Sequence, residues 1–228
     1  MPNNPYSVAQ AQGSALEINK VLKNTYALLG VTLLFSAVMA AVSIAINLGF
    51  GVALVMNLVA LGLVWFVLPR TANSSKGLAV VFAFTGLLGM GLGPTLNHYL
   101  AMSNGGTIVL QALGSTAMVF FALSAYVLTT RKDFSFMGGF LMTGLIVAIV
   151  AMVGLLVAGM FGVQIAGAHL ALSAVIALLM SGFILYDTSR IVNGGETNYI
   201  LATVALYLNV YNLFVSLLHL IGAFSGDD

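Results

Sequence analysis

Cysteine is absent from this chain of 228 residues, which excludes disulfide bonds, thiol catalysis and thiolate metal sites. Charge is also scarce: Asp, Glu, Lys and Arg make up 6% of the residues, whereas soluble domains average about 25%. The net charge is +1, and no basic patch or nucleic-acid-binding motif is present. We therefore expect no nucleic-acid partner, and a soluble fold is excluded.

Catalytic motifs are missing as well. The sequence contains no HExxH, GxSxG, P-loop or GxGD pattern, and no residue marks a base beside a nucleophile. We therefore expect a protein that is not an enzyme and holds no cofactor.

What the chain does contain is long apolar runs, because 61% of its residues are hydrophobic. A membrane-spanning helix needs about 20 such residues to cross about 30 Å of hydrocarbon. Backbone groups must be satisfied inside the bilayer, so runs of this length predict helices. The sequence therefore predicts an all-α membrane protein with seven transmembrane helices in residues 23–228, preceded by a polar, flexible tail in residues 1–22. The predicted spans are residues 25–48, 51–69, 78–100, 107–129, 136–161, 166–189 and 199–224.

Basic residues predict the orientation of these spans. With seven spans, every Lys and Arg falls on one side of the membrane, and the loops of the other side have none. Because cytoplasmic loops are enriched in basic residues, we expect a cytoplasmic N-terminus and a C-terminus on the outer side. The basic residues are Lys20, Lys23, Arg70, Lys76, Arg131, Lys132 and Arg190.

Asp187 is the only acidic residue embedded in an apolar run. A carboxylate in hydrocarbon costs about 2.5–3.5 kcal/mol on insertion scales, so Asp187 should face protein or water and have a partner. One hypothesis is a helix-end residue loosely paired with Arg190, three positions later. The other is a buried, titratable gate that pairs with Arg70, which the topology places at the same level.

The last span carries polar residues on one helical face: Asn209, Asn212, Ser216 and His219 are spaced 3, 4 and 3 apart. Hydrogen bonds between helices explain such a stripe, and we favour them for Asn212 and Ser216. A water-filled path or a central helix would show the same pattern. Asn57, in the middle of the second run, also needs a polar partner.

Three histidines, His98, His169 and His219, lie at span ends on the side without basic residues. They are either interfacial side chains or a cluster that senses pH or binds a transition metal. The third span carries Gly86, Gly89 and Gly93 before Pro94. This pattern predicts close helix packing with a proline kink, or a kinked helix that moves as a pore opens.

Four stretches of the chain carry long and specific motifs: FAFTGLLGMGLGPTL (82–96), LGSTAMVFFALSAYVLTTRKDFSFMGG (113–139), ILYDTSRI (184–191) and GGETNYILATVALYLNVYNLFVSLL (194–218). These stretches resemble the Bax inhibitor-1 family of multi-span membrane proteins, and the resemblance covers nearly everything after residue 20.

This resemblance implies six helices around a central seventh. It also implies a pH-sensitive calcium leak, sensed by one aspartate in the sixth helix and one in the seventh, with an arginine as latch. Asp187 matches the first aspartate and Arg70 matches the latch, but Asn209 stands where the second aspartate is expected. Asp and Asn do not form a coupled pair that shares a proton.

Within the family, GGETNYI and SAYVLTTRKD are most similar to a subgroup that modulates the membrane protease FtsH. The resemblance thus implies a bacterial inner-membrane protein that is in contact with lipids, has its C-terminus in the periplasm and binds FtsH. The polar N-terminal tail is low in charge and suits engagement by an ATP-driven protease, so our hypothesis is that the tail is the contact element. The competing implication is a leak with calcium as the permeant ion, gated by Asp187 with Arg70.

Overall fold

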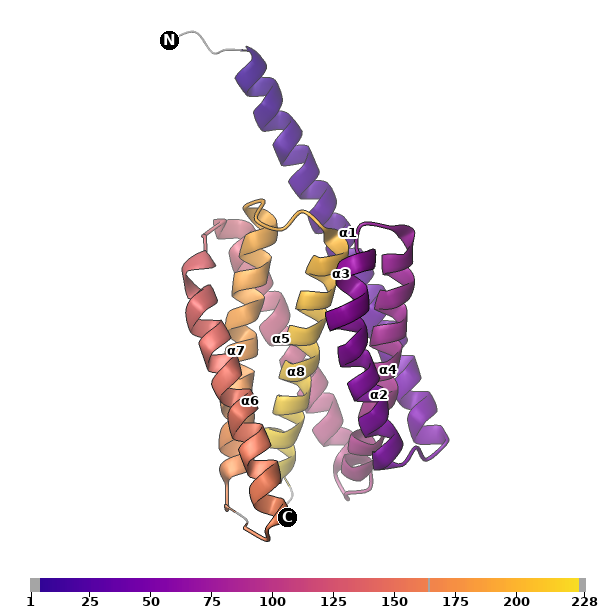
Figure 1. The fold of residues 1–228 in the computed structure, drawn as a ribbon. Helices are drawn as coiled ribbons and strands as arrows, with labels where there is room; N and C mark the ends of the chain where they lie inside the picture. The colour runs from indigo at the N-terminus through magenta and orange to yellow at the C-terminus, as the bar shows by residue number, and fades with distance from the viewer. Residues whose placement is uncertain (1–4, 164, 226–228) are drawn as a thin grey trace.

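The computed structural model describes residues 5–163 and 165–225, and side chains from residue 16 onward. The regular structure of these residues is entirely helical (Figure 1). The helices are α1 (Pro5–Ala45), α2 (Phe50–Gly62), the π-helical turn η1 (Leu63–Val67), α3 (Leu68–Thr71), α4 (Ser75–Leu100), α5 (Gly105–Thr130), the 3₁₀ turn η2 (Ser135–Met137), α6 (Gly138–Met160), α7 (Ala168–Val192) and α8 (Tyr199–Ser225).

Seven helices in the described part of the chain are long and apolar enough to cross a membrane, as predicted. The second span is composite, because α2, η1 and α3 together form Phe50–Thr71. We expected Pro69 to end this span, but the helix continues to Thr71. Proline lacks an N–H and clashes with the carbonyl four residues earlier, and the π-helical turn before Pro69 is a known way to relieve that conflict.

Helix α1 differs most from the prediction. Residues 5–22 were expected to be a flexible tail, yet α1 is helical from Pro5. The apolar part of α1 begins at Leu16, and the more N-terminal residues extend beyond the bundle (Figure 1). The side of the membrane on which this extension lies stays a prediction.

Helix α8 is the central element, as the family resemblance implied. It contacts α1, α4, α5 and α7, and it is, with α4, the most buried of the spans. The arrangement is more layered than six helices around one. Among the described residues α2 and α6 do not contact α8; α2 packs on α4, and α6 packs on α7.

Small residues bring α1 and α4 together. A Cβ atom on Gly86 would meet the Phe35 ring, and one on Gly89 would overlap the carbonyl oxygen of Ser36. This finding confirms the predicted close helix packing along the third span.

Pro94, inside α4, deprives the carbonyl of Met90 of its usual helical donor, because proline has no N–H. The Ser43 hydroxyl of α1 donates to that carbonyl at 2.7 Å. A side chain of one helix therefore satisfies the backbone group that proline frees in the other.

Every Lys and Arg lies toward one end of the bundle, which we call the basic end. This end is formed by the N-terminal half of α1, the α3–α4 turn, the α5–α6 connection and the α7–α8 loop (Figure 1). The three histidines lie toward the opposite end, near the end of α4, the start of α7 and the end of α8.

Candidate functional site

Asp187 and Asn209 form the polar joint between α7 and the central helix. The Asn209 side-chain amide donates to Oδ2 of Asp187 at 2.7 Å. Asn209 is 6% exposed, so little water competes for this hydrogen bond. A neutral amide bonded to a carboxylate is a charge-assisted interaction, stronger than a bond between two neutral groups. The pair therefore fixes the register of two helices that pack against each other over their length.

Neither Arg70 nor Arg190, the two arginines that we considered as partners from the sequence, forms an ion pair with Asp187. Within the described residues the only ion pair joins Arg190 to Glu196, at 3.6 Å. Arg190 also donates to the carbonyl of Gly195 and lies over the Tyr186 ring, so it orders the α7–α8 loop. Arg70 is exposed and donates to the carbonyl of Phe66 at 2.9 Å. A gating role for these residues stays a prediction.

Hydroxyl groups between the Asp187–Asn209 pair and the basic end were not singled out by the sequence. Thr188, fully buried beside Asp187, lies 3.5 Å from the Tyr26 hydroxyl of α1. One turn into α8, Thr203 donates to the carbonyl of Thr25 at 3.3 Å. Serine and threonine are common in membrane helices, so composition alone gave no signal that these were interhelical contacts. Together they tie α1 to α7 and α8 on the basic side of the pair.

The remaining residues of the predicted stripe on α8 do not form one continuous polar path. Asn212 donates to the carbonyl of Leu208 in its own helix, not to another helix as we expected. Ser216 is buried at 4% exposure, and His219 lies beside the Tyr99 ring of α4. The stripe therefore faces different neighbours along its length.

Asn57 packs its carboxamide against Gly91 of α4, where any larger residue would collide with it. Its side-chain oxygen is buried without a hydrogen-bond partner among the described residues. The predicted need for a polar partner is thus not met in this arrangement.

The histidines do not form a metal site in the described part of the chain. Tyr99 lies between two of them, with ring centroids 5.4 Å from His98 and 6.2 Å from His219. No group of three or more His, Asp or Glu side chains that could hold a metal ion occurs in residues 16–163 and 165–225. The metal-cluster hypothesis for His98, His169 and His219 therefore finds no geometric support.

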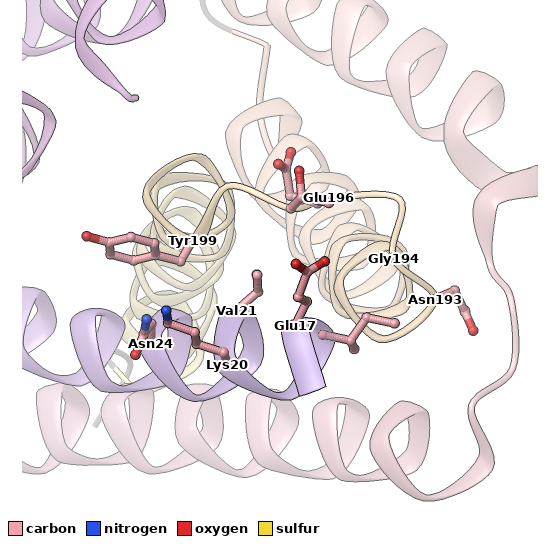
Figure 2. A pocket seen from close by; sticks show the side chains of 10 residues that line it. Glu17, Lys20, Val21, Asn24, Asn193, Gly194, Glu196 and Tyr199 are labelled. Atoms are coloured by element: carbon pink, nitrogen blue, oxygen red, sulfur yellow. The ribbon is translucent and has the colours of Figure 1, made fainter. Parts of the chain in front are cut away.

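A pocket of about 580 Å³ opens at the basic end, between the start of the apolar part of α1 and the α7–α8 loop. Figure 2 shows Glu17, Lys20 and Asn24 of α1 along one side, with Glu196 and Tyr199 across the pocket. The loop side is firmly held, because Asn198 caps α8 and also donates to the carbonyl of Ala72 in the α3–α4 turn. Charged and polar side chains, among them Glu17, Lys20 and Glu196, therefore line a pocket at the basic end.

Most of the chain matches the model of a known protein family. The family model described as inhibitor of apoptosis-promoting Bax1 matches residues 18–226. The chain belongs to the Bax inhibitor-1 family. The match covers the seven spans of this family member except for the first two residues of the first span, and it includes the α7–α8 pair that carries Asp187 and Asn209.

Similar full-length proteins occur in several bacteria. The chain is 51% identical over 214 residues, 94% of both chains, to a protein of Escherichia coli named modulator of FtsH protease YccA. It is 55% identical over 93% of both chains to an uncharacterized membrane protein of Vibrio cholerae. It is 45% identical over the whole of both chains to an uncharacterized protein of Pseudomonas aeruginosa. None of these three names describes an enzyme.

Proposed function

We propose that this family member is a non-catalytic modulator of the membrane protease FtsH, and that it acts in the bacterial inner membrane by direct binding. The observation that carries the proposal is the 51% identity, over 94% of both chains, to the E. coli protein named for that activity. An alignment of this extent includes most of the seven spans and of the loops between them.

The extension of α1 supports a physical route to binding. At 1.5 Å per residue, the 41 residues of α1 measure about 61 Å, roughly twice the hydrocarbon thickness. The excess of basic residues supports a cytoplasmic location for the basic end, and with it for the extension. An ATP-driven protease would meet this extension first, while a seven-helix body resists extraction and keeps the enzyme occupied. In this proposal the contact element is a helix and not the flexible tail that the sequence suggested.

Reconstitution tests the proposal and the route separately. Purified FtsH and the full chain are placed in the same vesicles with a membrane substrate of FtsH, and substrate degradation is followed over time. The matched variants lack residues 2–14, or carry a Gly/Ser repeat of equal length there. We expect the full chain to co-purify with FtsH and slow degradation, and both variants to lose the effect.

An intact chain that neither binds FtsH nor slows degradation would reject the proposed function. Variants that still slow degradation would reject only the α1 extension as the contact element.

The alternative is a pH-sensitive calcium leak gated by Asp187 with Arg70. Two observations weigh against it in this chain. Asn209 donates a hydrogen bond to Asp187 through an amide that does not titrate, so the two residues are not a pair of carboxyl groups that share one proton, and Arg70 bonds to the carbonyl of Phe66 instead. The modulator therefore remains the favoured function.

Calcium flux into vesicles that hold only the purified chain separates the two functions. The variants are Asp187→Asn and Asn209→Asp. We expect no flux from the parent chain, and any flux to appear only when Asn209→Asp restores two carboxylates. Flux from the parent chain that Asp187→Asn abolishes would favour the leak.

A further inference from the structure

A groove of about 570 Å³ runs along the side of the bundle between α1 and α5. Its α1 wall extends from Tyr26 to Ile44 and its α5 wall from Val109 to Phe121, while Tyr207 and Phe214 of α8 form the floor. Among the described residues no Cα atom of α1 lies within 8 Å of one in α5, although both helices contact α8. We call this opening the lateral groove.

The lateral groove lies entirely within the membrane spans, and none of its lining residues is charged. Its hydroxyl groups are already engaged. Ser36 lies 2.6 Å from the Tyr207 hydroxyl and Thr116 donates to the carbonyl of Ala112 at 2.7 Å. The rim faces outward, with Phe121 66% and Leu113 50% exposed. An occupant must therefore be uncharged, apolar and supplied from the hydrocarbon side.

The dimensions distinguish between the apolar occupants a membrane offers. From Tyr26 to Ile44 the α1 wall rises about 27 Å at 1.5 Å per residue. The volume of about 570 Å³ is the space open to the centre of a water molecule, and over that length it gives a track about 5 Å wide for that centre. Adding the radius of a water molecule, about 1.4 Å, on each side puts the walls on the order of 8 Å apart. An α-helix with its side chains is about 10–12 Å wide. A single hydrocarbon chain is narrower, because its carbon atoms contact neighbouring carbon atoms at about 3.5–4.0 Å. Such a chain therefore fits within the lateral groove, whereas a helix does not.

We propose that the lateral groove holds one acyl chain of a membrane phospholipid. The chain lies against the central helix between α1 and α5, and covers apolar surface that neither wall reaches. This inference does not depend on the proposed function, because it concerns a different face of the bundle.

Photolabelling of the full chain tests the proposal. The chain is reconstituted in vesicles of phosphatidylethanolamine and phosphatidylglycerol that contain phosphatidylethanolamine with a diazirine in one acyl chain. After irradiation, mass spectrometry locates the adducts. We expect adducts to be several-fold denser on the groove residues Leu113 and Phe121 than on Ile146 and Val150, which are similarly exposed on α6.

Matched variants make the test specific. Ala37→Phe and Ala117→Phe fill the groove from its two walls, whereas Val38→Phe and Met118→Phe place the same ring one residue away, outside the lining. All four positions are exposed, so folding should tolerate each ring, and the thermal unfolding midpoint verifies this. We expect groove adducts to fall several-fold in the first two variants and to stay unchanged in the controls.

Equal labelling of groove and α6 residues, or groove labelling that Ala37→Phe and Ala117→Phe leave unchanged, would overturn the proposal. Cross-linked dimers that pass through the groove residues would overturn it too, since they would show that a helix of a second copy occupies the groove.

Discussion

The side-chain amide of Asn209 donates the hydrogen bond that links Asp187 of α7 to α8. Asn209→Leu leaves the carboxylate without that donor, so we expect a loss of about 1–3 kcal/mol in the free energy of unfolding. In the double variant Asp187→Leu with Asn209→Leu both polar groups are gone, and much of the loss should be recovered. Unfolding in detergent, followed by circular dichroism, measures both. A double variant that loses the sum of the two single effects would contradict the pairing.

Asp133, in the α5–α6 connection outside the spans, provides a pH-dependent contact. The backbone N–H of Ser135 donates to Oδ1 of Asp133 at 2.8 Å, and this hydrogen bond lowers the pKa of the carboxyl below 3.8. Because the folded pKa is depressed, the contact stabilises the turn above the ordinary pKa and is lost as the pH falls through the folded value. NMR titration of the Asp133 carboxyl carbon should give a midpoint below 3.8, and a midpoint at or above 3.8 would show that the hydrogen bond is absent.

At the residue scale, the sequence identified both members of the central pair, but only the family resemblance, through its two sensor positions, indicated that they lie together. Asp187 stood out because a carboxylate in an apolar run needs a partner, and Asn209 stood out as part of a polar stripe and by family resemblance. The partner was expected to be an arginine, since opposite charge is the strongest signal that a sequence gives. Which residue meets Asp187 depends on the rotation and register of α7 against α8, which sequence spacing within one helix does not set.

The Ser43 hydroxyl of α1 donates a hydrogen bond to the Met90 carbonyl of α4, which Pro94 leaves without its helical donor. Ser43→Ala should cost about 1 kcal/mol, because the Met90 carbonyl loses its donor. With Pro94→Ala present, α4 regains an N–H that bonds to that carbonyl, so Ser43→Ala should cost clearly less. A double-mutant cycle of unfolding free energies measures the coupling. Additive effects would show that Ser43 does not replace the missing helical donor.

The α1–α4 contact should tolerate no side chain at Gly89. A Cβ atom there would overlap the backbone of Ser36, so we expect Gly89→Ala to lower the free energy of unfolding by about 1–3 kcal/mol. Gly114→Ala is the matched control, because a Cβ at that helical position meets nothing within 4 Å. Replacing a helical glycine with alanine in open space should be neutral or should stabilise by up to about 1 kcal/mol. Equal effects of the two variants would contradict the packing.

At the element scale, the sequence predicted the seven spans well, because apolar length and turn residues mark them. Asn47 and the glycines Gly162, Gly167 and Gly194 adopt positive φ at or near the expected breaks. The sequence did not predict that α1 begins at Pro5, because residues 5–22 are polar and contain no apolar run that would indicate a membrane helix. The turn at η1 was missed because a proline signals a helix end in sequence, while in the folded chain a local change of pitch accommodates it.

The whole molecule has one basic end, and this end should face the cytoplasm. Because the chain contains no cysteine, single-cysteine variants report orientation without background. Ser74→Cys lies in the α3–α4 turn at the basic end, and Ser103→Cys lies in the α4–α5 loop at the opposite end; both positions are exposed. In intact cells we expect a membrane-impermeant maleimide to label Ser103→Cys and not Ser74→Cys. The reverse pattern would invert the topology and remove the α1 extension from the reach of a cytoplasmic protease.

At this scale, composition and charge distribution predicted an all-α membrane protein and the number of its spans. The family resemblance predicted that the last helix is central. They did not predict that α2 and α6 lie in an outer layer, nor that α1 and α5 leave a groove between them. Both features arise from how the helices pack side by side. That packing depends on small residues and on pairs such as Asp187 and Asn209 from distant parts of the chain.

The most direct test of the account is whether the basic end contacts FtsH in a membrane. A photo-cross-linking amino acid is placed at Gln12 in the α1 extension, or at Ser103 at the opposite end as the control, in cells that contain FtsH. We predict a cross-linked product of the chain with FtsH from Gln12 and none from Ser103. Cross-linking from neither position, or from Ser103 alone, would contradict direct binding through the basic end.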